Sequence, residues 1–129
     1  MKSQYKPILI LSAYQISETQ ATNSKNHLLL GTSFKSAGVK FRHCTGVCKG
    51  AKEPSFIIDN NPDNLEVAIK IAQQFDQESI LQMDNEGRAQ LIFLKNRPKK
   101  VLGFISVSNI EPEGDYTYVN DTQEYVTFK

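Results

Sequence analysis

The 129-residue sequence contains no tryptophan, only two cysteines and almost no net charge. Lysine and arginine together number 15, and aspartate and glutamate number 14, which gives a formal net charge of +1. A protein that follows duplex DNA neutralises several phosphates and usually carries a clear cationic surplus. The charge balance therefore argues against a nucleic-acid partner.

Long apolar runs are also missing. The longest strongly apolar run, Ile8–Leu11, is far shorter than the roughly 18 residues that a membrane-spanning helix needs. The N-terminal residues have neither the layout of a signal peptide nor a small-residue cleavage site. We therefore expect no membrane partner and a cytoplasmic location.

The two cysteines, Cys44 and Cys48, do not suggest a disulfide. Along an extended strand they would lie roughly 13 Å apart, beyond the reach of an S–S bond, so in a reducing cytosol we expect two free thiols. With His43 they give at most three metal ligands, without the paired Cys-x2-Cys knuckles of structural zinc sites. We therefore predict no metal site.

Several catalytic signatures are absent as well. The sequence has no G-x-G-x-x-G, no Walker loop and no G-x-S-x-G, which are the motifs of dinucleotide binding, phosphate binding and α/β-hydrolases. His43 and Cys44 would point to opposite faces of a strand and would not form a nucleophile–base pair. We expect no cofactor and no cysteine nucleophile.

The sequence does have an ordinary globular composition, with 40% hydrophobic and 22% charged residues. A chain of this length buries roughly two thirds of the surface that its unfolded form exposes, which is enough for one core. We therefore expect one domain over residues 1–129.

The hydrophobic pattern predicts strands and helices in the order β, α, β, β, α, β, followed by further strands. The clearest signal is Asn61 as a helix cap, with Pro62 at the first helical position and Asp63 in the first turn. The expected strands are 7–14, 39–45, 55–58, 79–83, 89–94 and 101–107, with a possible edge strand in 116–128, and the expected helices are 23–37 and 62–77. This order predicts an α+β fold on the ferredoxin-like split βαβ plan (βαββαβ), an antiparallel sheet packed by two helices with additional C-terminal strands.

Polar residues occur at two junctions between these elements. Glu53 follows a glycine-containing loop, residues 46–50, at the mouth of a buried strand, and Gln77 and Glu78 join a helix to another strand. The chain turns tightly at such junctions, so we expect these side chains to face a cleft rather than open solvent.

Five segments of the sequence resemble a known protein family. The segments that carry the resemblance are a strand ending in Ser12-Ala13-Tyr14, a helix containing Asn23, the loop Gly46-Val47-Cys48-Lys49-Gly50, Glu53-Pro54-Ser55-Phe56 and Phe75-Asp76-Gln77-Glu78-Ser79. Over about Ile8–Val107 they are similar to the phage S-adenosylmethionine lyases, formerly called hydrolases. A wider bacterial domain family of unassigned function shares the E-x-S-F and F-x-Q-E patterns.

The resemblance implies an enzyme that splits S-adenosylmethionine into methylthioadenosine and homoserine lactone and works as a homotrimer with sites between subunits. Its expected role is to deplete the methyl donor and so counteract host restriction systems. The substrate's own carboxylate displaces its thioether, so no metal, protein nucleophile or general base is required. The resemblance implies Glu53 and Glu78 as catalytic residues, acting at the ammonium and methionyl end or at the ribose hydroxyls, and we do not distinguish between these roles. The expected substrate-binding residues are Tyr14, Asn23, Gly46, Cys48, Gly50, Ser55 and Gln77.

One position departs from the family pattern. Several members carry a tyrosine in the glycine loop where this sequence has Cys48. If that hydroxyl contacts substrate, activity here is slower, altered or replaced by binding alone. Two alternatives therefore stay open, a non-catalytic binder of a nucleoside-type ligand and an inhibitor of a host defence protein on the same fold.

Overall fold

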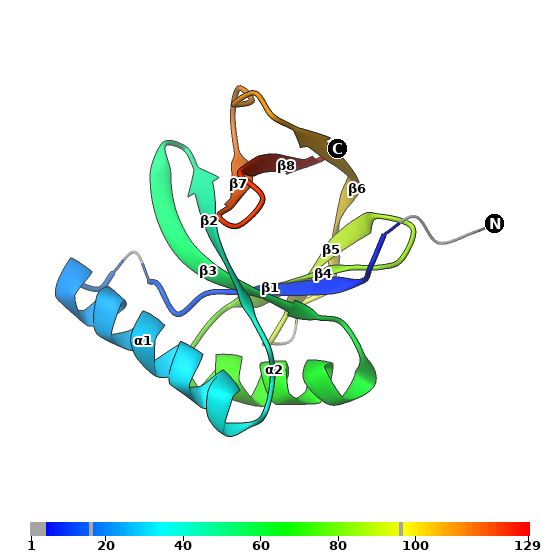
Figure 1. Ribbon diagram of the computed structural model, residues 1–129. Coiled ribbons are helices and arrows are strands. Elements are labelled where there is room, and N and C mark those ends of the chain that lie inside the picture. The colour runs from blue at the N-terminus through cyan, green and yellow to red at the C-terminus, as the bar shows by residue number, and fades with distance from the viewer. Residues whose placement is uncertain (1–4, 16, 96) are drawn as a thin grey trace.

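The computed structural model describes residues 5–15, 17–95 and 97–129. Eight antiparallel strands close into a β-barrel, and two helices pack against one side of it (Figure 1). The elements in chain order are β1 (Ile8–Leu11), α1 (Gln20–Ser36), β2 (Arg42–Cys48), β3 (Ala51–Asp59), α2 (Pro62–Gln74), β4 (Ser79–Met83), β5 (Arg88–Phe93), β6 (Lys100–Ser108), β7 (Tyr116–Val119) and β8 (Glu124–Phe128). Around the barrel the strands follow the order β1-β3-β2-β7-β8-β6-β5-β4.

The helix starts are set by local sequence. The Asn61 side chain accepts a hydrogen bond from the Asn64 amide, and Pro62 opens α2, as predicted, because proline loses no hydrogen bond at the first helical position. In α1 the Thr19 hydroxyl accepts from the Thr22 amide. The helix therefore begins at Gln20, earlier than the predicted residue 23.

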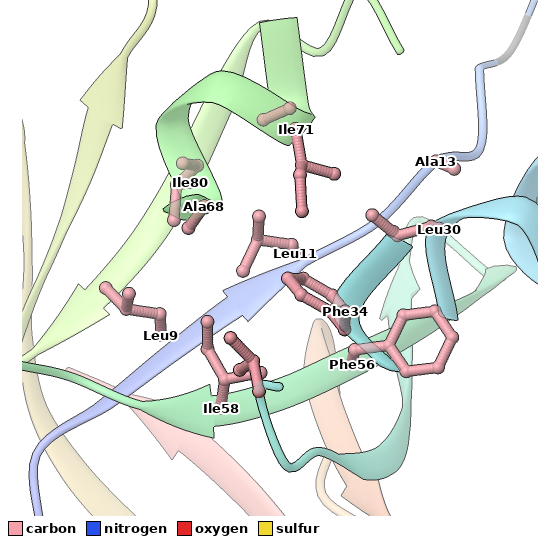
Figure 2. Close-up of a cluster of buried hydrophobic side chains, with 12 residues drawn as sticks. Leu9, Leu11, Ala13, Leu30, Phe34, Phe56, Ile58, Ala68, Ile71 and Ile80 are labelled. Carbon is pink, nitrogen blue, oxygen red and sulfur yellow. The ribbon is translucent and has the colours of Figure 1, made fainter. Parts of the chain in front are cut away.

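Strand β1 contributes to two separate cores because its side chains alternate. Leu9 and Leu11 lie between the sheet and the helices, whereas Ile8 and Ile10 pack into the barrel lumen. Leu9 and Leu11 pack there against Phe34 and the other buried residues of the first core (Figure 2). The lumen core is built around Cys44, Ile57, Val119 and Val126.

Gly31 explains how α1 approaches the sheet so closely. A Cβ at this position would lie 3.2 Å from Cζ of Phe56, which is tighter than ordinary side-chain packing. The Phe56 ring also meets Phe34 edge-on at a centroid distance of 5.8 Å. A glycine that weakens the helix on propensity alone therefore improves the packing of its buried face.

The C-terminal segment closes the barrel, where the sequence suggested a single edge strand. Residues 116–128 contain two strands, β7 and β8, which pair with each other. β7 also pairs with β2, and β8 pairs with β6. An eight-stranded sheet closed in this way leaves no free edge at this seam.

The expected loop at residues 46–50 is a tight hairpin. Gly46 and Cys48 belong to β2, and only Lys49 and Gly50 connect it to β3. Both connecting residues have positive φ, 51° and 81°, as a two-residue hairpin of this twist requires. β3 is correspondingly longer than the predicted 55–58, whereas β1 is shorter than the predicted 7–14.

The α+β class, the two helices, the antiparallel pairing and the additional C-terminal strands are confirmed. The ferredoxin-like plan is not established, because the strands continue around into a closed barrel. Both cysteines are free thiols, Cys44 buried and Cys48 exposed. Within the described ranges, neither helix has the length and apolarity that crossing a bilayer requires.

Replacing Gly103 with alanine should open the barrel seam. Gly103 has φ 111°, and a Cβ there would collide with the backbone of Lys129. We expect Gly103→Ala to lower the free energy of unfolding by more than about 3 kcal/mol in urea denaturation followed by circular dichroism.

Gly114→Ala is the matched control for this substitution. Gly114 also has positive φ, 80°, but no described atom lies within 4 Å of the added Cβ. We expect a loss of only about 1–2 kcal/mol from the backbone conformation. Equal losses in the two variants would contradict a role for the close approach of Lys129.

Candidate functional site

A cleft of about 730 Å³ lies where the end of β1, the start of α1 and the β2–β3 hairpin meet. Its volume falls in the range of small-molecule sites. It is lined by Tyr14, Gln15, Glu18, Gln20, Asn23, Cys48, Lys49, Ala51, Lys52, Glu53 and Pro54. The structure thus brings together four of the predicted site residues, Tyr14, Asn23, Cys48 and Glu53.

The segment that follows β1 is fixed on both sides. The Ser12 hydroxyl donates to the Pro54 carbonyl at 3.2 Å, which ties the segment to β3. On the other side Gln15 Nε2 donates to the Phe75 carbonyl at 2.8 Å. Tyr14 lies between these two attachments and is therefore held in place at the cleft wall.

Asn23 shapes the cleft through the backbone of the same segment. Its Oδ1 accepts from the Gln15 amide at 2.9 Å, and its Nδ2 donates to the Gln15 carbonyl at 2.9 Å. Asn23 is buried, and a buried polar side chain is stable only when it is hydrogen-bonded. Its role in this structure is to anchor Gln15 to α1.

Gln77 is positioned by the C-terminal cap of α2. The Gln77 amide donates to the Ala72 carbonyl at 3.0 Å, while Asp76 adopts positive φ, 53°, the geometry of a Schellman-type helix end. From there Gln77 Nε2 donates to the Tyr14 carbonyl at 3.3 Å. The predicted residues Gln77 and Tyr14 are therefore direct neighbours.

Glu53 and the exposed Glu18 are the two carboxylate residues that line the cleft. Glu53 is half-buried, and in the β2–β3 register it lies opposite Gly46. Because Gly46 has no side chain, the position across from Glu53 stays open on that face of the sheet. The predicted residue Ser55 is buried, and its hydroxyl donates to the Glu53 carbonyl at 3.2 Å, so it supports the strand. Gly50 lies in the hairpin turn beside the cleft.

Glu78 lies apart from this group. Its side chain is 80% exposed, and its carboxylate is 3.7 Å from the Arg97 guanidinium. Glu78 is not one of the described residues that line the cleft. The two predicted catalytic carboxylates therefore do not meet in one cleft of a single chain.

Cys48 is held by Asp115, a residue that sequence analysis missed. The Cys48 thiol donates to Asp115 Oδ2 at 3.5 Å, and Asp115 Oδ1 accepts from the Lys49 amide at 2.8 Å. The hydrogen bond to Asp115 raises the pKa of the Cys48 thiol, with a smaller contribution from burial. The Lys49 amide lowers the pKa of Asp115, so the carboxylate stays ionised and the thiol stays protonated.

An aromatic group lies behind Tyr14. The His27 ring meets the Tyr14 ring edge-on at a centroid distance of 6.1 Å and stacks on Phe56 at 4.4 Å. Burial, and to a smaller extent the neighbouring His43, lowers the pKa of His27. The imidazole is therefore neutral at pH 7, and the wall behind Tyr14 carries no charge there.

Other cleft residues were also missed by sequence analysis. Gln15 and Glu18 lie between β1 and α1, and Gln20 is the first residue of α1. Lys49 lies in the hairpin turn, and Lys52 follows it in β3. Their only sequence signal is proximity to predicted site residues. Asp115 lies more than 60 residues along the chain from Cys48, and no local pattern connects the two.

Comparison with known proteins shows the family of the chain. The model of the S-adenosylmethionine lyase family matches residues 9–128, nearly the whole chain. The chain belongs to this family. The resemblance predicted over about Ile8–Val107 is confirmed and extends through the C-terminal hairpin. A search of the curated proteins found no match.

Membership of the S-adenosylmethionine lyase family implies the reaction. The lyase is a carbon–sulfur lyase that acts on S-adenosylmethionine and forms methylthioadenosine and homoserine lactone. Both predictions, the enzyme class and the substrate, are therefore confirmed. The roles of individual residues stay predictions.

Removing the Asp115 charge should activate the Cys48 thiol of the lyase. In Asp115→Asn the amide oxygen can still accept from Lys49, but the carboxylate that raises the pKa of Cys48 is gone. The thiolate fraction at pH 8 therefore increases, and we expect iodoacetamide to alkylate Cys48 several times faster.

Mass spectrometry of the modified peptides measures this rate. Cys44 is an internal control, because burial raises its pKa to about 12, so it should stay unmodified in both proteins. An unchanged Cys48 rate would show that Asp115 does not control the thiol.

Proposed function

We propose that the cleft binds S-adenosylmethionine and that Glu53 receives its ammonium group. The observation that carries the proposal is the half-buried Glu53 carboxylate in a cleft of about 730 Å³ that belongs to a lyase. A carboxylate binds an ammonium group through charge-assisted hydrogen bonds. The ammonium group is retained in homoserine lactone, so Glu53 can hold it throughout the reaction.

The reaction on this proposal takes place within the substrate. A carboxylate oxygen attacks the γ-carbon, the carbon–sulfur bond breaks, and its electron pair goes to sulfur. The carboxylate and sulfonium charges disappear together, leaving a neutral lactone ester and a neutral thioether. Holding the methionyl chain in the folded geometry, with the reacting atoms near contact distance, contributes several kcal/mol through orientation alone.

Tyr14 and the hydrogen bonds around it support this positioning role. Tyr14 is held by Ser12 on one side and Gln77 on the other, and its ring has the neutral His27 behind it. A fixed aromatic wall without positive charge suits a nucleoside with an adjacent sulfonium. Strong binding of the sulfonium would oppose catalysis, since that charge is lost in the transition state.

We propose further that the working enzyme is a homotrimer whose sites lie between subunits. Six of the eleven cleft-lining residues are exposed, and water at an open cleft would solvate the attacking carboxylate and weaken it as a nucleophile. Leu28 and Leu29 of α1, the helix whose start lines the cleft, are 73% and 46% exposed. Exposed apolar side chains on a helix whose start lines an open cleft favour a covering subunit.

A shared site also accounts for Glu78. Its side chain lies outside the cleft of its own chain and is 80% exposed. We assign it to the ribose or methionyl end of a substrate bound in the cleft of a neighbouring subunit. Each site would then combine Glu53 of one chain with Glu78 of another.

The proposed biological role is depletion of the methyl donor in a bacterial cytoplasm by a phage-encoded enzyme. Restriction and modification systems that depend on S-adenosylmethionine would be blunted. A small enzyme without cofactor or metal suits such a role, because activity would follow directly from folding and assembly.

Replacing Glu53 with glutamine tests the assignment of the ammonium site. The substitution keeps the size and removes the charge, so we expect kcat/KM for methylthioadenosine formation to fall about 100-fold. Chromatography of the products measures the rate. Glu86→Gln, an exposed carboxylate in the β4–β5 turn, is the control and should keep full activity. Full activity in Glu53→Gln, or saturable binding by the wild-type protein without any product, would contradict the proposal.

Co-expression of two impaired variants tests the shared site. Glu53→Gln and Glu78→Gln should each be about 100-fold less active than the wild type as homotrimers. In mixed trimers, random assembly gives about a quarter of the sites both native carboxylates, so about a quarter of wild-type activity should return. Light scattering should give the mass of three chains. No recovery in mixed trimers would place both carboxylates in the same chain's site or outside any site.

A further inference from the structure

The barrel lumen contains a second cavity, with a volume of about 440 Å³. Its apolar lining comes from six strands and consists mainly of Ile8, Ile57, Met83, Ile105, Val119 and Val126. Side chains that alternate toward the inside of the barrel thus converge on one space. The interior of an eight-stranded barrel is small. It is either filled by side chains or holds one small ligand.

The lumen of this barrel is incompletely filled. Ile57, Val119 and Val126 are buried, but Ile8, Ile10, Ile105 and Phe128, which pack against them, remain partly exposed. Apolar side chains inside a filled barrel would be shielded from water on all sides. Ile8 and Ile105 line the cavity, so their partial exposure indicates that the cavity is open to solvent.

This cavity is separate from the substrate cleft. The cleft uses Ala51–Pro54 at the start of β3, whereas the cavity uses Ile57–Asp59 at its end. The same division holds in β2, with Cys48 at the cleft and Arg42 at the cavity. Glu53 and Ile57 are four positions apart along an extended strand, which corresponds to roughly 13 Å.

The charges around the cavity mouth compensate one another. Lys6 pairs with Asp59 at 3.2 Å, and Arg42 pairs at 2.7 Å with Asp121, which lies next to the lining but is not part of it. The other two charged lining residues, Lys40 and Glu124, carry opposite signs. A charged ligand would therefore find no surplus of opposite charge at the rim.

The lumen itself also disfavours charge. The Cys44 thiol packs with Ile57, Val119 and Val126, and burial raises its pKa to about 12. A group that must lose water to enter such surroundings is stable only in its neutral form.

We propose that the lumen cavity is a binding site for one small, uncharged, mainly apolar molecule. Its apolar body would lie among Ile8, Ile57, Ile105 and Val119, and a single polar end such as a hydroxyl would reach the rim near Thr122. An apolar cavity of about 150 Å³ is enough to bind benzene. The cavity of about 440 Å³ has room for a larger molecule, such as an eight-carbon alcohol or a two-ring aromatic.

Fluorescence titration with the neutral probe N-phenyl-1-naphthylamine tests the proposal on the full chain. We expect saturable binding of one probe per chain with a blue-shifted emission. 1-Octanol should displace the probe, and octanoate and octylammonium, which have the same chain length, should displace it at least tenfold less well. Equal displacement by the charged compounds would overturn the assignment of an uncharged ligand.

Variants locate the probe. Val119→Phe fills the lumen and should weaken probe binding at least tenfold. Ile8→Phe narrows the space from a partly exposed position, so it decides the result if Val119→Phe does not fold. Phe104→Ser removes an exposed aromatic residue that is 55% accessible, and it should leave binding unchanged, as should Glu53→Gln at the cleft. Unchanged binding in Ile8→Phe, or loss of binding in Phe104→Ser or Glu53→Gln, would overturn the proposal.

Discussion

Closure of the barrel by the C-terminal hairpin is the constraint on which the other features depend. β7 pairs with β2 and β8 pairs with β6, and Gly103 leaves the space in which the backbone of Lys129 completes the seam. Closure of the barrel encloses the lumen, and it also fixes part of the cleft wall. Asp115 directly precedes β7 and accepts from the Lys49 amide, so the seam that seals the barrel also fixes the hairpin turn at the cleft wall.

The two cavities are built by different kinds of element. The cleft forms where strands end and chain segments turn, so backbone groups there need side-chain partners, and Asn23 and Gln15 supply them. The lumen is lined within regular strands whose backbone groups are already paired. Its side chains are therefore free to be apolar. One small barrel thus carries a cleft at the β2–β3 hairpin and a second cavity in its lumen.

Local features were predictable from the sequence, and long-range ones were not. The Asn61 cap and Pro62 fix the start of α2 without help from the rest of the chain. Glu53 was predicted because a carboxylate at the mouth of an apolar strand is unusual on local grounds, and it lines the cleft. Barrel closure, the Cys48–Asp115 contact and the outward position of Glu78 depend on strand pairing between segments far apart in sequence, which no local periodicity encodes. The family motifs identified the chemistry but not the shape of the sheet.

β1 has only four residues, yet it pairs with β3 on one side and β4 on the other and contributes to both cores. The helical layer and the barrel lumen therefore have no boundary at which one can unfold while the other stays intact. Loss of β1 removes Leu9 from one core and Ile8 from the other at the same moment. We therefore expect the chain to unfold as one cooperative unit, in which the amides of β1 exchange with solvent only when the whole molecule opens.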